Sequence, residues 1–447
     1  MYKLLEEKII NFNERLPYKI KISLNSIICF LMVINTIFPI RILVESGLDA
    51  VIVFVLCILL AFFNLDRKNI GKKYNILVLL LVCFGLLVII VGIHYRVLGY
   101  ISVGFFYLTV TPIFIYVISD AKKAEDMLLS ISIGIEGAFI LLFFFSVLFC
   151  PLGGEQYQSF TGNPNSLGID AVLGLYASLY LFLKTNGRKR LFLIFLMGFS
   201  ISFIIFSRSR TALLAMLVAF FLICIYYCIN RLFLKIKMGM SIIIIACIVA
   251  SVFISYIGIT YVNDFLGVKN NDDLKESIEK HICIELDNSS ENIGFGQAIL
   301  LSSKRSLKGI TDENSFSSGR IVIWKKFIEN INFQGHKTGT LEIDNIKGFN
   351  AHSGYIQVAY SFGIIAGILY LLITIYILFK CFKLFCFCIS NKKMSNEILY
   401  ILVITGGFFI ESTLAAAVSP FSYVFVLMLN ICVIPFVYIL NGGEYKV

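Results

Sequence analysis

The sequence predicts an all-α polytopic membrane protein with about twelve transmembrane helices. Of the 447 residues, 58% are hydrophobic and 15% are charged, against about 45–50% and about 25% in soluble proteins. Mean hydropathy is +0.88, and the chain contains 42 Phe but only 7 Pro. A soluble globule of this size could not bury so much apolar surface, so lipid must solvate most of the chain. The same composition excludes a disordered protein, a collagen and a coiled coil.

Apolar runs long enough to cross a bilayer, which takes roughly 20 residues, occur throughout the chain. They lie near residues 22–40, 48–65, 74–93, 97–118, 127–149, 168–184, 191–206, 211–229, 239–262, 354–379, 397–418 and 421–440. We see no internal repeat among them and expect one transmembrane domain over residues 1–447. Residues 1–21 come before the first run and are amphipathic, with Leu5 and Ile9 opposite Glu6 and Lys8. They predict an interfacial helix on the cytoplasmic surface.

The orientation follows from Lys and Arg, which concentrate in cytoplasmic loops. With the N-terminus inside, the inner segments hold 23 of these residues and the short outer segments hold 4. The remaining 11 lie in the long outer segment 263–350, and long loops are exempt from the rule. We therefore expect both termini to be cytoplasmic. Topology also accounts for the net charge of +10, so a nucleic-acid partner is not needed to explain it.

The segment 263–350, between the ninth and tenth predicted spans, is the one sizeable hydrophilic part. Residues 272–286 and 320–331 carry apolar side chains at helical spacing and predict two amphipathic helices. Their apolar faces need a surface to cover. We expect this extracytoplasmic loop to fold back as a lid over the outer mouth of the bundle, not to form an independent domain.

Two arginines stand against the charge trend in the turn Ser207-Arg208-Ser209-Arg210-Thr211, between the seventh and eighth spans. The turn immediately precedes a predicted helix, where backbone N–H groups are unpaired and the helix dipole is positive. Two guanidinium groups at such a position form an anion site suited to a pyrophosphate. The alternative is that Arg208 and Arg210 are membrane anchors that reach the lipid headgroups.

His352 lies where the long outer segment re-enters the membrane, within Asn350-Ala351-His352-Ser353-Gly354-Tyr355. A histidine titrates near neutral pH and can act as a catalytic base, which makes His352 a candidate catalytic residue beside Tyr355. The alternative is a structural histidine.

Two weaker candidates flank these motifs. Arg320 opens the second loop helix, after Ser317-Ser318-Gly319, and would direct its charge beneath the lid; the alternative is a solvated loop arginine. The turn Thr161-Gly162-Asn163-Pro164-Asn165 leads into the sixth span from outside. Its Asn165 either contacts substrate or only caps that helix.

Glu136 and Glu411 lie within predicted spans, where carboxylates are candidates for function, although each could equally pair with a polar neighbour. The 12 cysteines are scattered and have no zinc-finger spacing, so we interpret them as structural thiols. The histidines also lack metal-ligand spacing. We therefore predict neither a metal nor a cofactor.

The ordered motifs together resemble the O-antigen ligase and O-antigen polymerase family of bacterial inner membranes. The resemblance rests on Thr-Gly-Asn-Pro-Asn, Ser-Arg-Ser-Arg-Thr, Ser-Gly-Arg followed by Trp, and Ala-His-Ser-Gly-Tyr before Gly363-Ile364-Ile365-Ala366-Gly367. By motif it covers roughly 160–379, and by span count and loop position it covers the whole chain. It implies a GT-C-like architecture and a metal-independent glycosyltransferase at the outer face of the cytoplasmic membrane.

The resemblance also implies roles for single residues. The donor is an undecaprenyl-pyrophosphate-linked oligosaccharide, whose pyrophosphate such proteins bind through arginines that correspond here to Arg208, Arg210 and Arg320. Acceptor activation carries over to His352. The next residue is Ser353, where ligases often have Asn. We expect Asn165 and Tyr355 to contact substrate as well.

Three functions follow as hypotheses. The first is an inverting polymerase that extends lipid-linked repeat units into O-antigen or capsule-type polysaccharide, with membrane lipid and a chain-length regulator protein as partners. The second is a ligase that transfers the glycan to lipid A core with the same residues. The third, from another class, is a flippase for lipid-linked sugars, in which Glu136 and Glu411 would be central.

Overall fold

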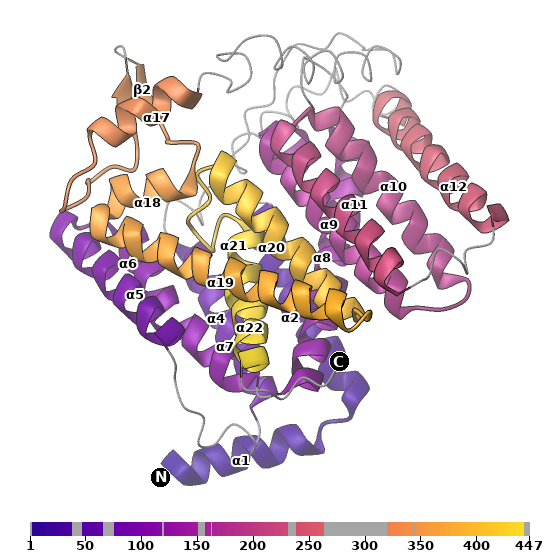
Figure 1. Cartoon of the computed structure of the whole chain (residues 1–447), viewed down its shortest axis with the longest axis horizontal. Coiled ribbons are helices and arrows are strands. Elements are labelled where there is room, and N and C mark those ends of the chain that lie inside the picture. Colours follow the sequence, from indigo (N-terminus) through magenta and orange to yellow (C-terminus); the bar gives the residue numbers. More distant parts are fainter. Residues whose placement is uncertain are drawn as a thin grey trace. The chain divides into compact units, whose positions relative to one another are not determined.

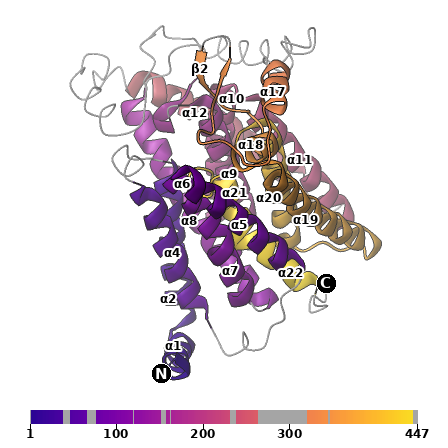
Figure 2. The ribbon, with the colours of Figure 1, turned by 90° about the vertical axis from the view of Figure 1, so that its left-hand side faces the viewer.

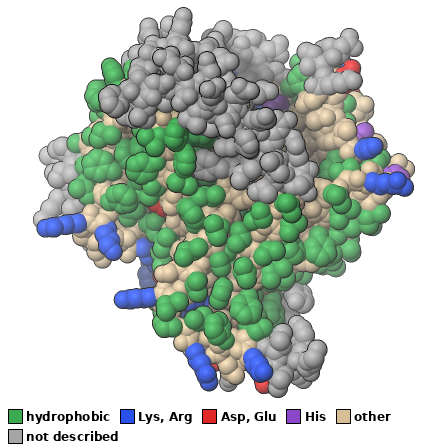
Figure 3. Space-filling view, turned by 180° about the vertical axis from the view of Figure 1, so that it is seen from behind, with side chains coloured by type: hydrophobic (Ala, Val, Ile, Leu, Met, Phe, Trp, Pro, Cys, Tyr) green, Lys and Arg blue, Asp and Glu red, His purple; other side chains and the backbone are tan. Residues whose placement is uncertain are grey.

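The computed structural model describes residues 2–37, 47–65, 76–118, 120–150, 157–161, 163–230, 238–262, 320–343 and 346–441. Most of these residues are helical (Figure 1). Nine helical segments in this part of the chain are long and apolar enough to cross a membrane: Tyr18–Ile37, Ile76–Tyr95, Leu98–Val117, Ala121–Phe149, Pro164–Lys184, Lys189–Ser207, Arg210–Ile229, Ile364–Ser390 and Asn396–Leu414. Hydrophobic side chains cover broad areas of the described surface (Figure 3). The predicted all-α polytopic membrane protein is confirmed at this level.

Three shorter apolar helices coincide with the other predicted spans. They cover Leu48–Asn64, Ile245–Tyr261 and Val424–Ile439. A helix of 17 residues is about 25 Å long, slightly less than the roughly 30 Å of a bilayer core. The count of twelve spans therefore stays a prediction. The proposed loop helix 272–286 lies outside the described residues, as do the serines before Arg320.

The chain divides into two compact units. Unit 1 comprises Met1–Met32, Ala50–Ile131 and Arg320–Val447, and unit 2 comprises Val33–Asp49 and Ser132–Gly319. The long helix α8 (Ala121–Phe149) contributes to both units, because the division falls between Ile131 and Ser132.

Unit 1 contains most of the helices. They are α1 (Tyr2–Arg15), most of α2 (Tyr18–Ile37), α4 (Leu48–Asn64), α5 (Ile76–Tyr95), α6 (Leu98–Phe105), α7 (Thr111–Val117), α17 (Arg320–Glu329), α18 (Gly354–Phe362), α19 (Ile364–Ser390), α20 (Asn396–Leu414), α21 (Val424–Met428) and α22 (Ile434–Asn441). Two π-helical segments, Phe106–Val110 and Leu429–Val433, interrupt otherwise continuous helices. They lie beside each other, since the Thr111 hydroxyl donates to Asn430 Oδ1 at 2.8 Å.

The predicted interfacial segment 1–21 is shorter in the structure. Helix α1 ends at Arg15, and residues from Tyr18 onward already belong to α2, which is long enough to span. Pro17 causes the break, because proline cannot donate a backbone hydrogen bond inside a helix. The Asn13 amide donates to the carbonyls of Phe62 and Leu65 at 2.6 and 3.1 Å. It thereby fixes α1 to the end of α4.

The tenth predicted span, 354–379, is wrong as a single helix. Helix α18 ends at Phe362, and α19 begins at Ile364 after Gly363, whose φ is +89°. A Cβ on Gly367 would lie 2.6 Å from the Ala359 Cβ, so α18 packs back along the first turns of α19 (Figure 1). His352 is therefore attached to a short helix packed on the span, not to the end of the span itself.

The described part of the loop packs on α18 as a small layer. Strands β1 (Leu341–Ile343) and β2 (Ile346–Phe349) form an antiparallel pair that the sequence analysis did not predict. Helix α17 confirms the predicted helix at 320–331. Figure 2 shows β2, α17 and α18 at one end of unit 1. Phe327, Ala351 and Tyr360 form the core of this layer. The expected cover of the apolar face of α17 is only partial, because Ile321 and Ile328 are 49% and 56% exposed.

Unit 2 contains part of α8 and the helices α9 (Pro164–Lys184), α10 (Lys189–Ser207), α11 (Arg210–Ile229) and α12 (Met238–Ile257). Small residues bring their backbones close together. A Cβ on Gly174 would lie 2.8 Å from the Phe139 ring of α8, and one on Gly198 would collide with the Ser251 Cβ of α12. Such close approach is typical of membrane helices, where glycine and serine line the interfaces.

The orientation can be tested directly with fusions to a reporter enzyme that is active only outside the membrane. We expect activity from a fusion after Gly296 and none from a fusion after Lys189, because 23 Lys/Arg lie in the predicted inner segments and 4 in the short outer ones. Enzyme activity per unit of fusion protein is the measurement. The opposite pattern would place the arginine turn inside and remove the predicted outer site.

Candidate functional site

The arginine turn of unit 2 is a tight connection between α10 and α11. Helix α10 ends at Ser207, and Arg208 adopts the left-handed conformation with φ of 52°. Ser209 caps α11, since its hydroxyl accepts from Ala212 N at 3.4 Å, and Arg210 is the first residue of that helix. Arg210 thus lies at the N-terminus of α11, as the sequence predicts, and Arg208, the C-cap of α10, directly precedes the residue that caps α11.

The burial of Arg208 disfavours a role as a lipid anchor. Its side chain is only 7% exposed, whereas an arginine that reaches the headgroups keeps its charged end in water. A left-handed non-glycine residue also costs of order 1–3 kcal/mol and is over-represented at functional sites. Arg210 is half-buried.

The second predicted turn is capped differently from the expectation. The residue that caps α9 is Asn163, whose Oδ1 accepts from Asn165 N at 2.8 Å. The Thr161 hydroxyl donates to Asn163 O at 2.9 Å and closes the turn. Asn165 as the capping residue is therefore wrong, because its backbone donates to the cap. Its side chain is exposed at the start of the helix.

The two turns of unit 2 lie against each other, a contact that sequence reasoning missed. A Cβ on Gly168 of α9 would lie 2.8 Å from the Ala212 Cβ, the Ser207 Oγ and the Ser209 Cβ. Tyr157 N also donates to Phe206 O at 3.1 Å. The N-terminal turns of α9 and α11 are therefore neighbours, and two positive helix ends and two arginines gather at one place. The available signal was Gly168 itself, a glycine within the first two turns of a helix.

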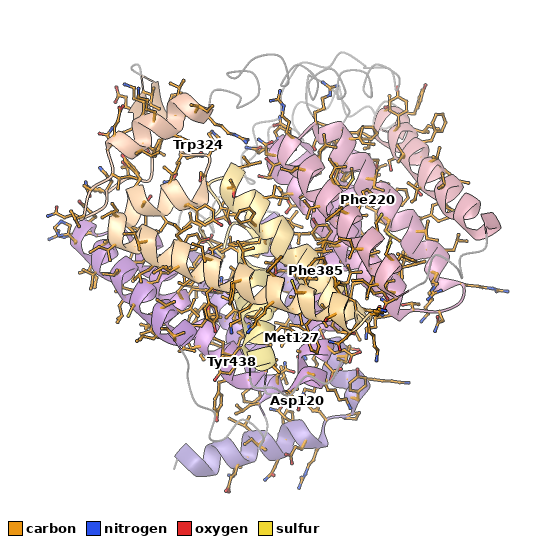
Figure 4. All side chains as sticks on the ribbon, in the orientation of Figure 1. Asp120, Met127, Phe220, Trp324, Phe385 and Tyr438 are labelled. Atoms are coloured by element: carbon orange, nitrogen blue, oxygen red, sulfur yellow. The ribbon has the colours of Figure 1, made fainter. Side chains whose placement is uncertain are left out.

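Arg320 and His352 lie close together in unit 1. His352 is half-buried with φ of 45°, and its backbone N–H donates to Asn350 Oδ1 at 3.1 Å. Burial lowers the pKa of His352 below its ordinary 6.5, and the charge of nearby Arg320 lowers it further. The imidazole is consequently neutral at pH 7, as a base requires. Trp324 lies one turn after Arg320 on α17 (Figure 4).

Gln357, which the sequence analysis did not consider, holds the His352 loop in place. Its Oε1 accepts from Ala351 N at 2.9 Å, and its Nε2 donates to Gly339 O at 2.6 Å. One side chain thus joins the residue before His352 to the segment that leads into β1. Only the three-dimensional contact reveals this role.

The predicted substrate-binding residue Tyr355 faces the interior of unit 1. Its ring lies 5.8 Å from that of Tyr370, and burial raises the pKa of Tyr355 to about 12. Contact with substrate stays a prediction for this residue. Arg320, His352 and Tyr355 belong to unit 1, whereas Asn165, Arg208 and Arg210 belong to unit 2. A single site that contains all six also stays a prediction.

The two carboxylates within the spans are closely enclosed. Glu136 is 5% exposed, and its Oε2 accepts from the Ser178 hydroxyl at 2.8 Å. Glu411, in the last turn of α20, is 1% exposed. A third carboxylate, Asp170 of α9, was missed by the sequence analysis and retains accessible surface. In the described residues, no group of three His, Cys, Asp or Glu side chains could hold a metal ion.

Comparisons with protein-family models, with curated proteins and with solved structures find no significant match for this chain.

Proposed function

We propose that this protein is an inverting, metal-independent glycosyltransferase that polymerises undecaprenyl-pyrophosphate-linked oligosaccharide at the outer face of a bacterial cytoplasmic membrane. The observation that carries the proposal is the contact between the two turns of unit 2. Two sequence motifs, each weak alone, meet through Gly168 and gather two arginines at paired helix N-termini.

This arrangement suits a pyrophosphate leaving group. When the anomeric carbon is attacked, the bond to the pyrophosphate oxygen breaks and negative charge develops on that group. Fixed arginines and helix N-termini stabilise such charge without having to reorganise, and they act most strongly where water is excluded. The burial of Arg208 supports this role.

The acceptor hydroxyl is a weak nucleophile that gains from a positioned base. His352 supplies a neutral imidazole, because burial and Arg320 lower its pKa. It would take the hydroxyl proton as the new glycosidic bond forms, and attack opposite the leaving group inverts the anomeric configuration. Arg320 would add a further positive charge for the phosphates.

Two rival functions use the same chain. A ligase would employ these residues with lipid A core as acceptor. The glycan profile of a strain lacking the gene would distinguish the ligase from the polymerase. Loss of long chains indicates the polymerase, and loss of all attachment to core indicates the ligase. A flippase would depend on Glu136 and Glu411 instead. The bond between Glu136 and Ser178 gives that carboxylate a structural role, which favours the enzyme.

The class of protein is tested by elongation of lipid-linked oligosaccharide with purified protein in detergent. A flippase moves its substrate between the two sides of a membrane without changing the length of the glycan. In detergent there is no sealed compartment, so transport cannot contribute to the result. We expect a ladder of longer lipid-linked products after electrophoresis of the reaction. Absence of longer products, under conditions where the donor demonstrably binds, would contradict the proposed function.

Metal chelation should leave this elongation intact. The proposal assigns the stabilisation of pyrophosphate to arginines and helix ends, so EDTA in excess over all divalent ions should change the initial rate less than twofold. Product length after a fixed time is the measurement, with a metal-dependent glycosyltransferase assayed in parallel. Loss of activity that added Mg²⁺ or Mn²⁺ restores would contradict the metal-free mechanism.

A further inference from the structure

One residue in the most enclosed stretch of α9 differs from its neighbours. Residues 167–169 and 171–178 are all buried, but Asp170 between them retains accessible surface. It lies six residues after the first residue of α9, which is about 9 Å along the helix axis. Asp170 is thus half-buried within a stretch of α9 whose neighbouring side chains are buried.

Asp170 continues a polar face that begins at the N-terminal end of α9. Ser166, one turn earlier and on the same face, is half-buried, and the cap Asn163 above it is exposed. We call Asn163, Ser166 and Asp170 the polar strip. Below Asp170 the same face carries Leu173 and Ala177, which are 2% and 0% exposed. The strip therefore ends on an apolar floor enclosed by protein, not on a surface that faces lipid.

The polar strip points away from the arginine turn. Gly168 contacts Ser207, Ser209 and Ala212, and a residue two positions further is rotated by about 200° around the helix. Asp170 therefore leaves α9 on the opposite side.

The Asp170 carboxylate makes no hydrogen bond or ion pair with the part of the chain that the structure describes. Glu136 of the same unit is bonded to Ser178 and closed off. A carboxylate at membrane depth is costly to retain without a partner and is a candidate for function by default. Asp170 thus has lone pairs available to a ligand, and its side chain is not fully enclosed by protein.

We propose that the polar strip binds sugar hydroxyls of the lipid-linked oligosaccharide, with the Asp170 carboxylate as their hydrogen-bond acceptor. Amide, hydroxyl and carboxylate groups match the donors and acceptors of a neutral glycan. The strip contains no Lys or Arg, so it does not attract the pyrophosphate. Helix α9 then separates two functions: its first turn meets the arginines, and its opposite face holds sugar. The inference rests on the proposed function for the identity of the ligand.

The experiment compares two lipids by native mass spectrometry of the detergent-solubilised full chain. The probes are undecaprenyl pyrophosphate without sugar and undecaprenyl pyrophosphate that carries one repeat unit from the producing cells. We expect wild type to prefer the sugar-bearing lipid, and Asp170→Asn to reduce that preference about tenfold, the usual worth of a charged hydrogen bond. Affinity for the sugar-free lipid should not change.

Matched variants separate a binding role from a folding defect. Ser166→Ala, at a half-buried position, should reduce the preference in the same direction but less. Glu136→Gln removes a buried carboxylate of the same unit and should leave the preference unchanged. Arg210→Ala should weaken binding of both lipids equally. Melting temperature and gel filtration of each variant report folding.

The outcomes also separate the inference from the proposed function. Equal preference in wild type and Asp170→Asn, with both folded, overturns the sugar-binding strip even if wild type elongates its substrate. An Asp170-dependent preference without elongation keeps the strip and overturns the enzyme. If Asp170→Asn instead abolishes a dependence on Na⁺ or K⁺ and leaves sugar preference intact, the strip binds a cation and the inference is wrong.

Discussion

Arg210→Ala should abolish detectable polymer while the protein still inserts into the membrane. Loss of one fixed donor to a developing oxyanion typically costs about 10²–10³ in turnover, and Arg210 stands at the N-terminus of α11, two residues after the buried Arg208. Arg210→Lys should recover little, because lysine is a point charge and loses the bidentate fork that matches a phosphate. Polymer length in cells and initial rate of elongation in detergent are the measurements.

The structure supplies a control for this prediction. Arg190, in the first turn of α10, belongs to the same unit and donates from Nε to Thr185 O at 2.6 Å. Arg190→Ala therefore removes an equal charge from the other end of α10 and should leave polymer length unchanged. The capping bond from Ala212 to Ser209 survives in the Arg210 variants, so α11 keeps its start. Full activity of both Arg210 variants would reduce the pair to membrane anchors.

Hydropathy predicts the helices well because each segment that crosses the lipid must itself be apolar, which its own residues show. It fails at Gly363, where an apolar run continues through a reversal of the chain. The glycines Gly335 and Gly363 approach each other's segments too closely for a Cβ, and His336 N donates to Ser361 O at 3.1 Å. That contact joins the loop to the α18–α19 junction across a gap in sequence, so no local pattern reveals it.

The candidate site follows the same division. Each turn could be predicted from its own residues, since Asn-Pro and Ser before a helix are local signals. The contact between the turns depends on tertiary packing at Gly168, which a single sequence does not display. Asp170 was missed for a related reason. The predicted span began at 168, which made Asp170 look like an end residue, whereas α9 begins at Pro164.

His352→Ala should lower turnover by roughly two to four orders of magnitude, the usual worth of general base catalysis. Donor binding should change little, because arginines supply it. The acid limb of the pH profile is a second readout. Since burial and Arg320 lower the pKa of His352 below 6.5, the neutral base persists at neutral pH, and wild-type activity should fall only as the pH drops through that lowered value. Arg320→Gln removes a neighbouring positive charge and should move this limb to higher pH.

Three controls make the His352 result decisive between an enzyme and a transporter. His94, exposed at the end of α5 in the same unit, should tolerate substitution by alanine with elongation unchanged. Glu136→Gln and Glu411→Gln should keep measurable polymerisation, because the proposed chemistry does not use them. A folded His352→Ala that binds donor but fails to elongate it fits only a chemical role. If wild type fails to elongate a bound donor in detergent and both glutamates prove essential in cells, the transporter hypothesis replaces the enzyme hypothesis. Carboxylates within spans would then serve the movement of charge through the membrane, as in transporters.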